Sequence, residues 1–103
     1  MYYFIENKRL ELIVTRHPAL VEYLREIGLA SPETVVVSHA SPEAVAGKRV
    51  CGVLPHSLSC LCATFTEVPL SLPAELRGAE LTLEDVRKYA SAPATYRVKR
   101  VAT

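Results

Sequence analysis

The sequence contains no tryptophan and no glutamine, and Asn7 is its only asparagine. This shortage of thermolabile amides fits a heat-adapted source. It also lacks a long hydrophobic run, because the apolar segment over residues 1–8 is too short for a signal peptide or a membrane span. Neither positive nor negative charge dominates, since the sequence has 12 Lys and Arg residues and 11 Asp and Glu residues. A net charge of +1 excludes a general nucleic-acid coat, DNA included.

Cysteine is scarce, and its pattern excludes a disulfide framework. The sequence has three cysteines, Cys51, Cys60 and Cys62. The number is odd, and no two of them form a CxxC pair. We interpret all three as small buried hydrophobes in a reducing compartment. With no membrane segment, the sequence predicts a cytoplasmic protein.

Several chemical motifs are missing. There is no GxGxxG and no GxxxxGK[ST], which disfavours a dinucleotide site or a P-loop. HExxH and GxSxG are also missing, and no His/Cys spacing suits structural zinc. Three histidines remain as candidate metal ligands, but no carboxylate stands close to them. We therefore predict no metal and no cofactor, and keep a metal-dependent phosphoesterase as a distant alternative.

Half of the 103 residues are hydrophobic, which excludes a disordered chain. The length predicts one domain over 1–103, with an N-terminal extension at 1–9. Because so small a domain has a thin core, some apolar surface is expected to be buried in an oligomer.

Short apolar runs alternate with helix signals along the chain. A proline follows an N-cap position at Pro18 and at Pro42, and Thr82 with Asp85 resembles a capping box. Strands are predicted at residues 10–15, 34–37 (buried), 49–54, 66–72 and 96–101, and residues 2–5 are a further candidate. This alternation predicts an α/β fold: a single Rossmann-like domain whose mostly parallel central sheet is flanked by helices.

Each histidine follows a predicted strand: His17 the first, His39 the second and His56 the third. In a parallel sheet these turns share the carboxyl edge, where ligands bind. Polar residues are common in loops, so the grouping indicates a site more strongly than any one residue does. Arginines and helix N-termini at this edge suit a phosphate. The candidates in these turns and after the fourth run are Arg16, His17, Ser38, His39, Pro55, His56, Ser57, Ser71 and Arg77.

Four segments, in order, resemble the small Csx-type accessory proteins of type III CRISPR systems. They are Thr15–Ala19 (TRHPA), Val37–His39 (VSH), Gly52–Pro55 (GVLP) and Leu72–Leu81 (LPAELRGAEL). The resemblance covers roughly residues 10–98, and its last segment is the most specific.

The resemblance implies a homodimeric ring nuclease, which is a hydrolase of antiviral defence. Such an enzyme cleaves cyclic oligoadenylate, and the expected substrate is cyclic tetra-adenylate. It implies that Arg16, His17, Ser38, His39 and Arg77 line the ligand site. Cleavage needs no metal, because the ligand's own 2′-hydroxyl can attack the adjacent phosphorus and leave a 2′,3′-cyclic phosphate. Arg16 or Arg77 would stabilise the phosphorane charge, and His17 or His39 would transfer protons.

Two positions where the family usually carries acidic residues hold Ser71 and Ala40–Ser41 here. Binding needs only the arginines and the helix N-termini, whereas cleavage also needs proton transfer. The alternative reading is therefore a sponge or sensor that binds the cyclic messenger without cutting it.

Overall fold

The computed structural model describes residues 9–103, so the candidate strand at residues 2–5 lies outside the described residues. The described part contains five strands, four α-helices and a 3₁₀ helix. The strands are β1 (Leu12–Val14), β2 (Val35–Val37), β3 (Arg49–Gly52), β4 (Thr64–Glu67) and β5 (Ala94–Tyr96). The helices are α1 (Pro18–Glu26), α2 (Pro42–Val45), α3 (His56–Ser59), η2 (Ala74–Leu76) and α4 (Leu83–Tyr89).

The strands form one sheet in the order β2-β1-β3-β4-β5. The first four strands in the chain are parallel, and β5 pairs antiparallel with β4. The chain moves from β1 outward to β2 and then returns to place β3 on the other side of β1. The strand order therefore reverses between β1 and β3, and such a switch point opens a crevice at the carboxyl edge.

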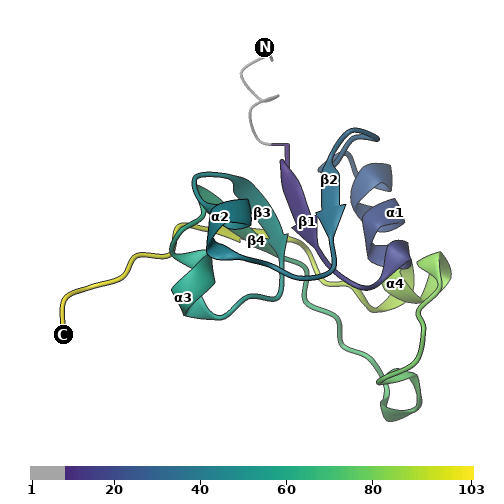
Figure 1. Ribbon diagram of the computed structural model, residues 1–103. Coiled ribbons are helices and arrows are strands. Elements are labelled where there is room, and N and C mark those ends of the chain that lie inside the picture. Colours follow the sequence, from purple (N-terminus) through teal and green to yellow (C-terminus); the bar gives the residue numbers. More distant parts are fainter. Residues whose placement is uncertain (1–8) are drawn as a thin grey trace.

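Helices cover both faces of the sheet (Figure 1). Because successive side chains in a strand point to opposite faces, β1 contributes to two separate cores. Ile13 packs in the core beneath α1 and α4. Leu12 and Val14 pack in the core beneath α2. The structure therefore confirms the predicted α/β class and the mostly parallel sheet flanked by helices.

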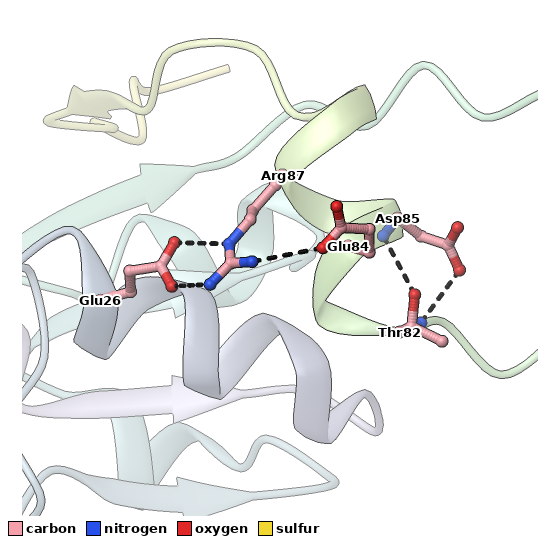
Figure 2. Close-up of polar contacts among 5 residues, drawn as sticks. All are labelled: Glu26, Thr82, Glu84, Asp85 and Arg87. Atoms are coloured by element: carbon pink, nitrogen blue, oxygen red, sulfur yellow. Dashed lines mark hydrogen bonds and ion pairs between the residues drawn. The ribbon is translucent and has the colours of Figure 1, made fainter.

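The helix boundaries follow the predicted signals. Pro18 occupies the first turn of α1, and Gly28, with φ of +86°, follows its end. The Ser41 side chain accepts a hydrogen bond from the Ala44 N–H at the start of α2. At α4 the Thr82 and Asp85 side chains each accept the other residue's backbone N–H, at 3.1 and 3.0 Å, so the capping box is formed (Figure 2).

The first and third strands are shorter than predicted, spanning 12–14 and 49–52, and the other three strand predictions were wrong in part. The second strand is not buried: Val35 is 56% exposed and Val36 40% exposed, because β2 is the edge of the sheet. The fourth strand spans 64–67 rather than 66–72, since it ends before Pro69 and leaves only an isolated bridge from Leu70 to Ala90. The last strand spans 94–96 rather than 96–101, and residues 97–103 form no strand.

An ion pair links α1 to α4 on the surface (Figure 2). The Arg87 guanidinium donates to both carboxylate oxygens of Glu26, through Nε at 2.9 Å and through Nη2. Its Nη1 also donates to Glu84 at 3.3 Å. The hydrogen bond from Arg87 is the main cause that lowers the pKa of Glu26. The pair joins helices that are distant in the sequence.

Residues 68–82 form a long connection that projects from the domain on the side where the parallel strands end (Figure 1). The Ser71 N–H donates to the Tyr89 carbonyl at its beginning, and buried Leu81 anchors its end. Residues 77–80 between these anchors are exposed. Among the described residues, no helix is long and apolar enough to cross a membrane.

Candidate functional site

A cavity of about 350 Å³ lies at the carboxyl edge of the sheet, at the switch point between β1 and β3. Four strand ends contribute to it, as the topology requires for a ligand crevice. Its lining consists of Val14, Thr15, Arg16, His17, Leu20, Ser38, Cys51, Gly52, Val53, Glu67, Val68 and Leu70. We call this the edge cavity.

The turn after β1 supplies the cationic and titratable groups of the edge cavity. The Thr15 hydroxyl accepts a hydrogen bond from the His17 N–H at 3.1 Å, which fixes the turn. His17 is the N-cap of α1 in extended conformation, and its side chain makes no cap hydrogen bond. Arg16 and His17 are both exposed, so their side chains are available to a ligand.

The turn after β2 brings two more predicted residues to the same place. Ser38 lines the edge cavity, and the Thr15 N–H donates to the Val37 carbonyl at 2.9 Å beside it. Arg16 Nη2 lies 3.4 Å from Nε2 of His39. Since a guanidinium only donates, this contact requires a His39 Nε2 that carries a lone pair. The structure thus groups Arg16, His17, Ser38 and His39.

The end of β3 forms the inner wall of the edge cavity. A Cβ added to Gly52 would lie 2.7 Å from the Val14 carbonyl oxygen, so this wall requires glycine. Cys51 beside it is 1% exposed, and burial raises the pKa of its thiol to about 12. The thiol is therefore protonated at neutral pH and serves as apolar surface. Neither Gly52 nor Val53 was singled out from the sequence as a cavity residue.

Glu67, at the end of β4, is the carboxylate of the edge cavity, and sequence reasoning missed it. It follows the same rule as the histidines, because it stands at the carboxyl end of a parallel strand. The prediction of a strand over 66–72 placed it inside the strand instead of at its end. The cavity therefore combines a cation, an imidazole and a carboxylate.

The structure does not bring His56 and Ser57 to the edge cavity. Both lie on α3 and line a separate cavity of about 570 Å³ with Lys99 and Arg100. Pro55, the N-cap of α3, lines neither cavity.

Ser71 and Arg77 lie in the projecting connection of residues 68–82. Ser71 is exposed and sits beside the bridge from Leu70 to Ala90. Arg77 is the exposed C-cap of η2 and lines none of the cavities described here. Within one chain, neither residue lines the cavity that holds Arg16.

The thiols and metal-ligating groups are dispersed. All three cysteines are free, and only Cys51 is fully buried, so the prediction that Cys60 and Cys62 are buried was too strong; both are half-buried. Among residues 9–103, no group of three or more His, Cys, Asp or Glu is placed to hold a metal ion.

Comparison with known proteins gives one match. The model of the family described as "Putative CRISPR-associated protein (Cas_VVA1548)" matches residues 12–99, which include all five strands and the edge cavity. The chain matches no curated protein and no solved structure. The match confirms the CRISPR association that the four sequence segments indicated. The chain belongs to this family of CRISPR-associated proteins.

Proposed function

We propose that the protein is a metal-independent ring nuclease that opens cyclic oligoadenylate, with cyclic tetra-adenylate as the first candidate, and so ends type III CRISPR signalling. The observation that carries the proposal is the grouping of Arg16, His17 and Ser38 around one cavity, with His39 in contact with Arg16. The CRISPR family gives this chemistry its context.

The edge cavity suits one nucleotide of such a ligand. Its volume of about 350 Å³ is at the small end of the range of about 300–1,000 Å³ for ligand sites. Leu20, Val68 and Leu70 supply apolar wall for a base, while Arg16 supplies a cation for a phosphate. Glu67 supplies an acceptor for an exocyclic amino group such as that of adenine. The rest of a ring extends beyond this cavity.

In the proposed reaction, the 2′-oxygen of the bound nucleotide bonds to the adjacent phosphorus and the bond from phosphorus to the 5′-oxygen breaks. One product end carries a 2′,3′-cyclic phosphate and the other a 5′-hydroxyl. The protein's main contribution is orientation, which reaches about 7–11 kcal/mol in the best intramolecular cases. No water, metal or cofactor enters this step.

The geometry suggests a division of roles among the polar groups. His17 lines the cavity and is assigned the proton transfer between the 2′-hydroxyl and the 5′-oxygen. Arg16 stabilises the charge on the phosphorane oxygens. His39 does not line the cavity and holds Arg16 through its Nε2, so we assign it a positioning role.

We further propose that the domain is Rossmann-like, cytoplasmic and homodimeric. The order β2-β1-β3-β4 with a switch point beside β1 supports the first of these assignments. A second copy related by a two-fold axis matches a symmetric ring and supplies the remaining contacts. Arg77, which is exposed and does not line its own edge cavity, is then available to the ring from either subunit.

The alternative is a sponge or sensor that binds the ring without cutting it. The exposure of His17 and the absence of a cap hydrogen bond from its side chain favour this reading, since no hydrogen bond from residues 9–103 fixes its imidazole. Binding would then rest on Arg16 and the apolar wall.

The deciding experiment incubates the protein with radiolabelled cyclic tetra-adenylate in EDTA and resolves the products by thin-layer chromatography. We expect linear products that end in a cyclic phosphate. The R16A variant should lower the rate about 10²–10³-fold, as loss of a stabilising donor does. H17A should lower turnover about 10²–10⁴-fold with a smaller effect on affinity.

Lys88→Ala is the matched control, because it removes one exposed cation from α4, outside the edge cavity. An intact ring retained by the wild-type protein would establish the sponge. A ring that is neither bound nor cut, with or without EDTA, would refute both readings. Cleavage that occurs only when EDTA is omitted would establish metal-dependent chemistry.

A further inference from the structure

A second set of polar residues lies apart from the edge cavity, between α3 and the chain after β5. His56 and Ser57 of α3 face Lys99 and Arg100 across the cavity of about 570 Å³. His56 also lines an adjoining cavity of about 370 Å³ with Phe65, Tyr96 and Arg97. Because the two cavities share His56 and Val98, they form one continuous surface. We call it the α3–β5 surface; its residues are His56, Ser57, Tyr96, Arg97, Lys99 and Arg100.

The charge of the α3–β5 surface is concentrated although the chain is nearly neutral. Arg97, Lys99 and Arg100 place three cations within four residues, and all three are exposed. None of them forms an ion pair with a carboxylate of residues 9–103. Among the described residues that line the two cavities, Glu67 is the one carboxylate, and it also lines the edge cavity. The surface is therefore suited to a polyanion.

Aromatic rings lie beside these cations. Phe65 of β4 pairs with Tyr96 of β5, so their side chains share one face of the sheet. Tyr96 is 48% exposed, although it lies in a strand. An exposed ring next to a row of cations is the combination with which proteins bind unpaired bases and their phosphates.

We propose that the α3–β5 surface binds a single-stranded oligonucleotide, with bases stacked on Tyr96 and phosphates held by Arg97, Lys99 and Arg100. The site is separate from the edge cavity and does not depend on the ring-nuclease function. An acidic peptide would satisfy the cations but would leave the exposed ring unused. Glu67 lines both cavities, so the proposed oligonucleotide site and the edge cavity adjoin at this residue.

The test measures fluorescence anisotropy of a labelled single-stranded oligoribonucleotide of about ten nucleotides, within the usual range of site sizes. We expect salt-dependent binding whose logarithmic slope is about −2, since three phosphate contacts contribute about −0.7 each. Y96A should weaken binding at least about five-fold, whereas Y96F, which keeps the ring, should bind nearly as wild type does. A duplex of the same sequence should bind less well, because its bases are already stacked.

K99A and K88A form the matched pair, since each removes one exposed lysine and only Lys99 lines the surface. K99A should reduce the salt slope by about 0.7, and K88A should leave it unchanged. Equal effects of the two variants, or an acidic peptide that displaces the strand while Y96A has no effect, would overturn the proposal. Cleavage of the cyclic ligand by K99A should be normal, so this proposal and the ring-nuclease proposal fail separately.

Discussion

At the scale of single residues, Gly52 sets how closely β1 and β3 approach beside the edge cavity. Because Gly52 has no side chain, the Val14 carbonyl oxygen can lie 2.7 Å from the position that a Cβ would occupy. We predict that Gly52→Ala destabilises the fold by about 1–3 kcal/mol, because backbone must move to admit the methyl group. It should also lower binding of the cyclic ligand. Urea unfolding and a binding titration measure the two effects.

The neighbouring Val53→Ala provides the comparison. Val53 is 94% exposed, so its truncation should change stability by less than about 0.5 kcal/mol. A Gly52→Ala protein as stable as Val53→Ala would show that the strands separate without cost.

Sequence reasoning located part of the site because one rule governs it. Polar residues after β1 and β2 must meet at one edge, so Arg16, His17, Ser38 and His39 could be predicted. His56 also follows a parallel strand, but it lies on the side of β3 away from β1. It could not be excluded from the site, because local sequence patterns do not reveal the order of the strands in the sheet. The projecting position of Arg77 depends on the path of a loop, which no local pattern specifies.

At the scale of elements, the same limit explains the wrong strand predictions. A run of valines looks alike in a central strand and in an edge strand, so β2 was expected to be buried. Helices were predicted more accurately, because Pro18, Ser41 and Thr82 mark their starts through local hydrogen bonds and backbone angles. Partners along the chain can be read from sequence, whereas partners across the sheet cannot.

The ion pair between α1 and α4 gives an element-scale prediction. In the folded protein the pKa of Glu26 lies below its ordinary value of 4.5, chiefly because Arg87 donates a hydrogen bond to it. The resulting stabilisation is present above the ordinary pKa and is lost as the pH falls through the lowered folded pKa. Glu26→Gln should therefore be less stable than wild type at neutral pH, and the difference should vanish in acid.

Urea unfolding over a series of pH values measures this difference. Glu22→Gln is the matched control on the same helix, because Glu22 makes no ion pair with the described residues. The effect should be small and should fall with added salt, since the pair is exposed. A difference that persisted in acid would show that Glu26 acts through packing instead.

At the scale of the whole molecule, the exposed edge of β2 favours the proposed dimer. Val36 on this edge lines a cavity with Glu22 and Arg25. In a dimer related by a two-fold axis, Glu22 of one copy can therefore lie opposite Arg25 of the other. We predict a dimer in sedimentation velocity and a monomer for Val36→Lys, because an edge lysine blocks strand pairing. Val101→Lys, at another exposed valine, should stay dimeric. A monomeric wild-type protein would contradict the dimer, and a dimeric Val36→Lys would place the interface elsewhere.

The projecting connection of residues 68–82 has a consequence for how the chain holds together when it is broken. Between β1 and β5, trypsin should cut first after Arg77, because residues 77–80 are exposed and lie at a helix end. The two fragments would still share the ladder between β4 and β5, the Glu26–Arg87 pair and the core that contains Leu24 and Val86. We predict a nicked protein that migrates intact in native gels and splits only in denaturant. Two separately made halves, divided at this bond, should then complement each other.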